Sequence, residues 1–135
     1  MSIFSSPRFL RNVLLADAVS CVASGGLQLA FTGAMAQLMN LPAALLTGTG
    51  VFLVVYAAVV AFVATRDPVP RAIVWLLVVG NLGWALGCIA VATTGMLAPS
   101  ALGMAWVLAQ AATVVVLAEL QWAGLRRAPV TGWAA

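Results

Sequence analysis

The sequence predicts an all-α protein: a four-helix transmembrane bundle with short loops and with both termini in the cytoplasm. Of the 135 residues, 64% are hydrophobic and 7% are charged, and the mean hydropathy is +1.14. So few polar side chains cannot cover the surface of a soluble globule. Four apolar segments are each about 20 residues or longer, which is enough to cross a hydrocarbon core of roughly 30 Å.

Prolines mark where these segments begin. Pro7, Pro42, Pro70 and Pro99 each stand at or near the start of one apolar run, where a helix does not use its first N–H groups. We expect one transmembrane domain that takes up residues 1–135, with the stretches "TGAMAQLMN" and "LAPS" as connections. The predicted helices are residues 7–31, 42–66, 70–96 and 99–127.

The arginines predict the orientation. They lie before the first helix, around the turn between the second and third helices, and at the end of the fourth, while the other two connections carry no charge. Because cytoplasmic loops are rich in basic residues, both termini and the middle turn are predicted to lie in the cytoplasm, in a multi-pass protein of the bacterial inner membrane. The six basic residues are Arg8, Arg11, Arg66, Arg71, Arg126 and Arg127.

The first apolar segment, "NVLLADAVSCVASGGLQLAF", contains the acidic residue Asp17. The apolar run before Asp17 is too short for a signal peptide, and a carboxylate inside such a run is unfavourable. The stretch "AVSC" has alanine where a lipoprotein signal usually has leucine. We therefore expect a retained transmembrane helix that carries an acidic residue.

Polar side chains recur along one face of this helix. Asp17, Ser20, Cys21, Ser24 and Gln28 follow the helical spacing of three, four, seven and eleven residues. Polar groups that face lipid are costly. This face is therefore predicted to point into the protein.

Asp17 and Glu119 lie at a similar predicted depth, about 9–10 Å beyond the nearest arginines. They could form a carboxylate pair in a proton or cation site, or both could be shallow anchors that reach head groups and water. Glu119 projects nearly opposite to Gln110 on the helical wheel. Glu119 could therefore face a second subunit, another protein or the head groups instead.

In two further pairs of polar residues, both members lie at the same predicted depth in the membrane. Tyr56 and Asn81 lie about 15 Å from the arginines, and Gln28 and Gln110 about 25 Å. Each pair could form a hydrogen bond between helices, worth about 1 kcal/mol. The candidates for a ligand or proton site are Asp17, Glu119, Asn81, Tyr56, Gln28 and Gln110.

Small residues predict where helices pack closely. Gly80, Gly83 and Gly87 form a smooth strip on the third predicted helix, and Ser20 and Ser24 offer a similar surface on the first. Such strips let two backbones approach each other. We expect the glycine strip to pack inside the bundle, with a homodimer contact as the alternative.

Several kinds of chemistry are not expected. The chain has no histidine, so a histidine-ligated metal or haem is excluded, and no cofactor is predicted. Cys21 and Cys88 differ by about 10 Å in predicted depth, too far for a disulfide. The arginines form no continuous basic face, so no nucleic-acid partner is expected. No nucleophile has an adjacent base, which argues against an enzyme.

The segments "GNLGWALG" and "VLAQAATVVVLAELQWAGLRR" resemble parts of small four-helix bacterial inner-membrane proteins of uncharacterised activity. This resemblance implies the fold and the membrane location, and it supplies no substrate or catalytic residues. The chain departs from the small multidrug transporters in two ways. The acidic residue of its first helix is an aspartate in a different local sequence, and its arginines all lie on one predicted side of the membrane.

These observations predict a protein without enzymatic activity that acts through helix–helix contacts, as an accessory subunit or as a scaffold for an apolar ligand. The alternative is an oligomeric transporter or channel for a small solute, coupled to protons or cations through Asp17. The expected partners are membrane lipid and either further copies of the chain or another membrane protein.

Overall fold

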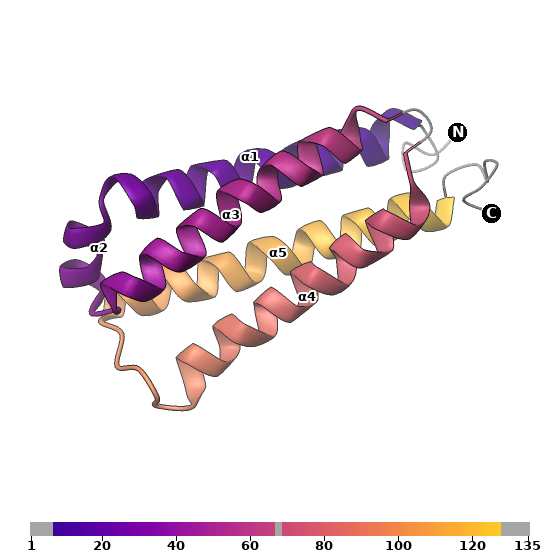
Figure 1. The fold of residues 1–135 in the computed structure, drawn as a ribbon. Helices are drawn as coiled ribbons and strands as arrows, with labels where there is room; N and C mark the ends of the chain where they lie inside the picture. The colour runs from indigo at the N-terminus through magenta and orange to yellow at the C-terminus, as the bar shows by residue number, and fades with distance from the viewer. Residues whose placement is uncertain (1–6, 67–68, 128–135) are drawn as a thin grey trace.

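The computed structural model describes residues 7–66 and 69–127 and is all-helical in these ranges. Four of its helices are long and apolar enough to cross a membrane, and one is a short helix at the far end of the bundle (Figure 1). The predicted all-α bundle with four membrane-length helices is therefore confirmed, as expected for a multi-pass membrane protein. The helices are α1 (Pro7–Ala30), α2 (Thr32–Met39), α3 (Ala43–Ala64), α4 (Arg71–Thr93) and α5 (Ala101–Arg127).

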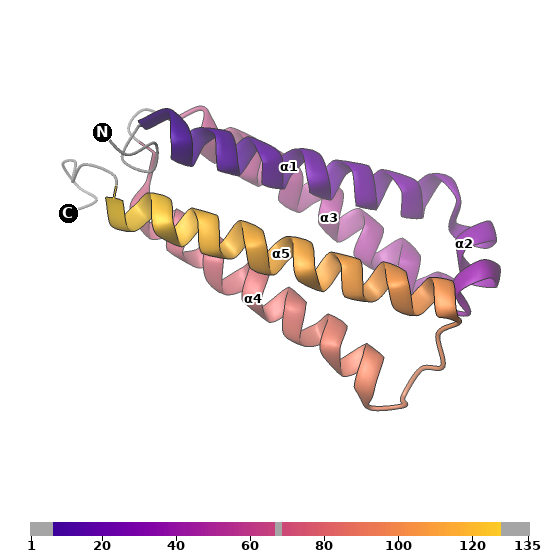
Figure 2. The same ribbon diagram turned by 180° about the vertical axis from the view of Figure 1, so that it is seen from behind.

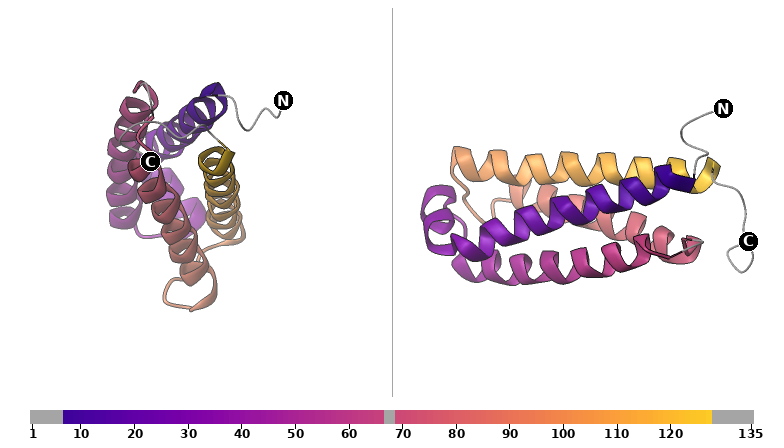
Figure 3. Two further views of the ribbon diagram at one scale, coloured as in Figure 1. Left: turned by 90° about the vertical axis from the view of Figure 1, so that its right-hand side faces the viewer. Right: turned by 90° about the horizontal axis from the view of Figure 1, so that it is seen from above.

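The four long helices are arranged as two pairs. Helix α1 packs along α3 and α4 packs along α5, and the two pairs meet mainly through α1 and α5; Figure 2 shows this contact from behind. Helices α3 and α4 lie nearer each other where α3 ends and α4 begins, and they diverge toward the α2 end (Figures 1 and 3). The start of α1, the end of α3, the start of α4 and the end of α5 lie at one end of the bundle.

The outer surface of the bundle is as apolar as its interior. On α5 the buried residues Val107, Ala111 and Val114 recur every three or four positions, which is the period of a helix face that packs inward. Yet Leu76 and Leu86, which point outward from α4, are 70% and 68% exposed. A helix that is hydrophobic all round suits contact with protein on one side and with lipid on the other.

Helices α1 and α3 cross at close range. An added Cβ on Gly25 would lie 2.8 Å from the carbonyl oxygen of Gly50, which is closer than two such atoms can approach. Only a glycine therefore allows the two backbones to meet at this point. The α1–α3 pair depends on this crossing.

The predicted packing of the glycine strip inside the bundle is wrong. Gly80, Gly83 and Gly87 are exposed, and an added Cβ on any of them would have no heavy atom within 4 Å. Helix α4 packs on the bundle through its other face, which includes the buried Val78 and Asn81. Because every face of this helix is apolar, hydrophobicity did not indicate which face packs inward.

The similar small-residue surface predicted on the first helix lines a cavity instead of a helix contact. Ser20 and Ser24 are half-buried, and they line a small cavity with residues of α3, α4 and α5. They do not pack against the glycine strip, where an added Cβ would have no heavy atom within 4 Å.

The stretch "TGAMAQLMN", predicted as a loop, is mostly the helix α2. Phe31 interrupts the helical path with φ −126° and ψ 34°, and Asn40 ends α2 in the left-handed conformation with φ 53°. Met35 and Met39 are buried one turn apart in a cluster with Leu46 of α3. This burial stabilises a short helix where the composition indicated only a connection.

The predicted boundaries of the long helices are correct to within a few residues. The largest difference is at α4, which ends at Thr93 rather than at Met96, before Gly95 with a φ of 74°. A positive φ suits glycine and ends a helix.

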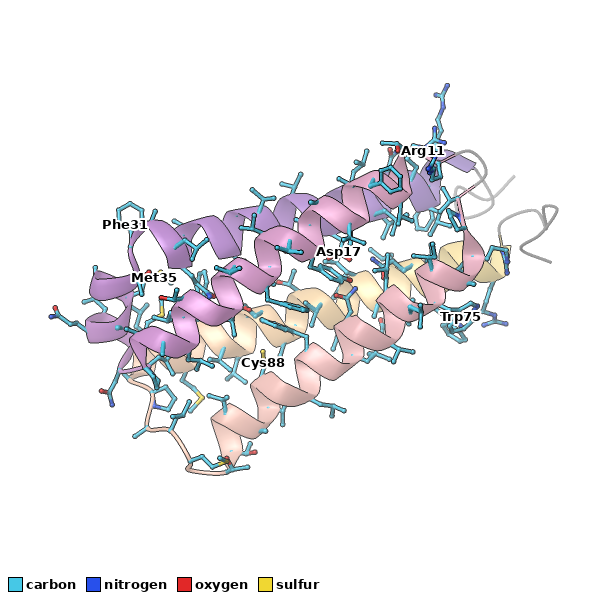
Figure 4. All side chains as sticks on the ribbon, in the orientation of Figure 1. Arg11, Asp17, Phe31, Met35, Trp75 and Cys88 are labelled. Carbon is cyan, nitrogen blue, oxygen red and sulfur yellow. The ribbon has the colours of Figure 1, made fainter. Side chains whose placement is uncertain are left out.

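The arginine-rich end is held together by specific contacts. The Arg11 Nε donates a hydrogen bond to the carbonyl oxygen of Ala64 at 3.0 Å, where the last carbonyl groups of α3 lack helical partners. Arg66 stands over the ring of Phe62 at 4.4 Å, and Arg126 over the ring of Trp122 at 4.7 Å. These contacts fix cationic side chains around one end of the bundle (Figure 4).

Candidate functional site

Two hydrogen-bonded groups of polar side chains lie inside the bundle. The first, the Asp17 network, is centred on a carboxyl group that is 0% exposed, and Figure 4 shows Asp17 between the long helices. Each long helix contributes at least one member, so the network ties all four together. Its members are Asp17, Cys21, Tyr56, Asn81 and Gln121.

The Asp17 carboxyl group is surrounded by donors. Gln121 Nε2 donates to Asp17 Oδ2 at 2.7 Å, and Asn81 Nδ2 donates to the same oxygen at 3.2 Å. The Tyr56 hydroxyl lies 3.5 Å from Oδ2, and the Cys21 thiol 3.5 Å from Oδ1. All four of these partners are neutral side chains. The network is therefore built to supply an acceptor group in the membrane interior with hydrogen bonds from its neighbours.

Asn81 connects the partners of Asp17 to one another. Its Nδ2 donates to Gln121 Oε1 at 3.1 Å, and its Oδ1 accepts from the Tyr56 hydroxyl at 3.5 Å. The predicted contact between Tyr56 and Asn81 is therefore confirmed. It joins α3 to α4 near the middle of both helices.

The structure does not bring Asp17 and Glu119 together. Asp17 is fully buried, whereas Glu119 is exposed on the outer side of α5. Two residues along a helix correspond to a rotation of about 200°, so Gln121 points inward where Glu119 points outward. Of the alternatives that the sequence left open, the carboxylate pair and the shallow anchoring of Asp17 are wrong, whereas the projection of Glu119 away from Gln110 is confirmed.

The second group, the Gln28 network, lies nearer the α2 end. Gln28 is 2% exposed, and its Nε2 donates to the carbonyl oxygen of Leu46 at 2.9 Å and to Thr49 Oγ1 at 2.8 Å. Its Oε1 accepts from Trp106 Nε1 at 3.4 Å and from Gln110 Nε2 at 3.3 Å. The predicted pairing of Gln28 with Gln110 is confirmed. The network comprises Gln28, Thr49, Trp84, Trp106 and Gln110.

Trp84 links this network to helix α3. Its indole N–H donates to Gln110 Oε1 at 3.1 Å. Its ring stacks on Phe52, with centroids 5.6 Å apart and planes 7° apart. Since Phe52 belongs to α3 and Trp84 to α4, this stack bridges the two helices where they begin to diverge.

Beyond the stack, the divergence of α3 and α4 leaves a cavity of about 400 Å³, which we call the cleft. Its outermost lining residues are Leu45 on α3 and Gly83 and Gly87 on α4, all of which are exposed. The cleft therefore opens sideways between these two helices, toward the surroundings of the bundle. The lining residues are Gln28, Leu41, Leu45, Leu46, Thr49, Gly83, Trp84, Gly87, Cys88, Val91, Trp106, Val107 and Gln110.

A smaller cavity of about 120 Å³ shares three of its lining side chains with the cleft. Trp84, Trp106 and Gln110 line both cavities. Cys21 of the Asp17 network lines the smaller one, while Cys88 lines the cleft. Both cysteines are free thiols.

Five residues of these networks were not among the predicted site residues: Cys21, Thr49, Trp84, Trp106 and Gln121. A signal existed for Gln121, which is eleven residues from Gln110 and therefore on the same helix face at the depth of Asp17. The tryptophans gave a weaker signal, because an indole in an apolar helix is equally typical of lipid contact.

Comparison with protein families, characterised proteins and solved structures gave no match for this chain.

Proposed function

We propose that this protein is a membrane scaffold without enzymatic activity that binds an apolar ligand in the cleft between α3 and α4. The observation that carries the proposal is a cavity of about 400 Å³ with a sideways mouth. Its size lies within the range of about 300–1,000 Å³ that is typical of small-molecule sites. Apolar walls with a few convergent polar groups are also typical of such sites.

The glycines at the mouth support binding in the cleft. Gly83 and Gly87 line it, whereas Gly80, which is also exposed on the same helix, does not. The missing side chains leave room for a ligand beside the α4 backbone. In the accessory-subunit version of the proposal, the same glycines would instead contact a helix of a partner protein.

We place the protein in the bacterial inner membrane with its arginine-rich end in the cytoplasm. This orientation is supported by Arg11, Arg66, Arg71 and Arg126, which belong to that end, and by the absence of charge in α2 and in residues 94–100. A ligand would then reach the cleft from the outer half of the bilayer.

The test is native mass spectrometry of the protein extracted with its own lipids. The wild type is expected to retain a lipid-like molecule, Gly87→Leu to lose it, and Gly80→Leu to keep it. The control is closely matched, because neither position has a heavy atom within 4 Å of an added Cβ. Equal retention by both variants would refute binding in the cleft. If Gly87→Leu instead loses a bound polypeptide, the accessory-subunit version holds.

A second candidate function is an oligomeric transporter or channel coupled to protons or cations through Asp17. The specific observation in its favour is the fully buried carboxyl group, because ionisable groups inside membranes often mark ion or proton pathways. The test is flux into proteoliposomes that contain a pH-sensitive dye. The transporter requires a proton-linked flux that Asp17→Asn abolishes and Glu119→Gln leaves intact, and it is rejected if the wild type and Asp17→Asn behave alike.

A further inference from the structure

The lining of the cleft specifies the chemistry of its ligand. Among the described residues, no lining side chain carries a charge. A charged group inside an apolar cavity without a partner is strongly unfavourable. The part of the ligand that enters the cleft is therefore neutral, and an ionised phosphate or ammonium group would have to stay outside.

The hydrogen-bonding capacity of the Gln28 network is almost fully used. The Gln28 amide makes two hydrogen bonds as donor and two as acceptor, which is all that such an amide can make. The indole N–H groups of Trp84 and Trp106 also have partners. These side chains fix the floor of the cleft.

Gln110 differs, because its amide can donate one more hydrogen bond than it does. Its Nε2 carries two N–H groups, and the bond to Gln28 Oε1 at 3.3 Å uses one of them. Within the part of the chain that the structure describes, no hydrogen bond is found for the other N–H. The side chain is half-buried and lines both the cleft and the smaller cavity, so a ligand in the cleft lies beside this amide.

The depth of Gln110 limits what can reach it. It is nine residues beyond the start of α5 at Ala101, which corresponds to about 14 Å along the helix. A ligand oxygen at this depth belongs to a molecule that inserts a neutral polar group below the head-group region.

We propose that the cleft binds a lipid-like molecule with a neutral carbonyl oxygen, and that this oxygen accepts a hydrogen bond from the Gln110 amide. The proposal rests on the proposed function of the cleft and adds the class of ligand. Two sources offer this chemistry: the ester carbonyl of a phospholipid chain, and the ring carbonyl of a free quinone-like lipid. In both cases the apolar chain lies along Gly83 and Gly87.

The test uses two brominated probes with the same carbon skeleton, 4-bromophenyl decyl ketone and 1-bromo-4-undecylbenzene. They differ only in a carbonyl group in place of a methylene. Bromine quenches tryptophan fluorescence, and Trp84 and Trp106 line the cleft. The component of quenching that Gly87→Leu removes, and Gly80→Leu does not, reports binding in the cleft.

The wild type is expected to bind the ketone about fivefold more tightly than the hydrocarbon, the difference typical of one neutral hydrogen bond. Gln110→Met keeps the length of the side chain and removes the donor, so it should abolish this preference. Thr113→Val is the control, because Thr113 donates to its own helix at Ala109 and does not line the cleft. It should keep the preference.

The hydrocarbon probe separates a lost hydrogen bond from a damaged cleft. If Gln110→Met weakens both probes equally, or if the wild type binds both equally, the carbonyl proposal is overturned while the cleft remains a binding site. If neither probe responds to Gly87→Leu, the proposed function fails as well.

The two sources are separated by repeating the ketone measurement in vesicles of ester-linked and of ether-linked phosphatidylcholine. If the natural ligand is a phospholipid ester, the ester lipid competes, and the ketone binds more weakly there than in ether lipid. Equal affinity in both vesicles identifies a free carbonyl lipid as the ligand. Each result supports the carbonyl proposal, provided that the Gln110→Met effect is present.

Discussion

Gln121 Nε2 donates a hydrogen bond of 2.7 Å to Asp17 Oδ2, which joins the last membrane helix to the first. Both side chains are 0% exposed. This bond is the shortest in a network that links all four long helices between the arginine-rich end and the cleft. The helices therefore converge at this network and diverge at the cleft.

Removing the acceptor of this network should destabilise the bundle. In Asp17→Leu, the donors of Tyr56, Asn81 and Gln121 lose their shared partner, and we expect a loss of about 2 kcal/mol in the free energy of unfolding. Unfolding in mixed detergent micelles, followed by circular dichroism, measures this loss. Glu119→Leu is the control, because Glu119 is exposed. Equal stability of the two variants would show that the network does not hold the bundle.

The bond between Asp17 and Gln121 should also appear as an energetic coupling. A double-mutant cycle with Asp17→Leu and Gln121→Leu is expected to give an interaction energy of about 1 kcal/mol, because either substitution alone already removes the hydrogen bond between the two side chains. The same unfolding measurement supplies all four stabilities. Strict additivity of the two substitutions would contradict the contact.

The crossing of α1 and α3 predicts different outcomes for two adjacent glycines. In Gly25→Ala the new Cβ meets the carbonyl oxygen of Gly50 at 2.8 Å, so the helices must separate, at an expected cost of about 1–3 kcal/mol. In Gly26→Ala the new Cβ has no heavy atom within 4 Å, and stability should stay level or rise slightly. The thermal midpoint of both variants in detergent tests this, and a reversed order would refute the crossing.

The arginine at the start of α1 should stabilise the end of α3. Arg11→Met keeps an apolar chain of similar length and removes the hydrogen bonds to the carbonyl oxygens of Ala64 and Arg66. We expect a loss of about 1 kcal/mol, together with faster hydrogen exchange in the last turn of α3. Arg126→Met removes the contact with Trp122 instead, and it should leave exchange in α3 unchanged. Unchanged exchange in Arg11→Met would contradict the capping role.

The depth of each polar residue could be predicted from the sequence, whereas the packing faces could not. Counting about 1.5 Å per residue from the arginines paired Tyr56 with Asn81 and Gln28 with Gln110, because the rise of a helix is constant. The same count placed Asp17 beside Glu119. The helical wheel already separated the two acids, because it turned Glu119 away from Gln110, and in the structure Gln121 points inward instead.

Rotation was hard to infer because lipid-facing and protein-facing sides are equally apolar in this chain. The strip from Gly80 to Gly87 therefore looked like a packing surface, while the true close approach, between Gly25 and Gly50, gave no stronger signal in the sequence. Nothing in the sequence indicated the cleft either. It arises from the divergence of α3 and α4, which depends on the packing of all four helices.

The most direct test of the cleft is the quenching of its two tryptophans by lipid chains. We would replace Trp75, Trp122 and Trp133 by phenylalanine, which leaves Trp84 and Trp106 as reporters, and reconstitute the protein in vesicles whose acyl chains carry bromine. A lipid-accessible cleft predicts strong quenching that Gly87→Leu lowers and Gly80→Leu does not. If quenching is the same in all three proteins, no lipid chain enters between α3 and α4, and the account of the cleft as a ligand site is wrong.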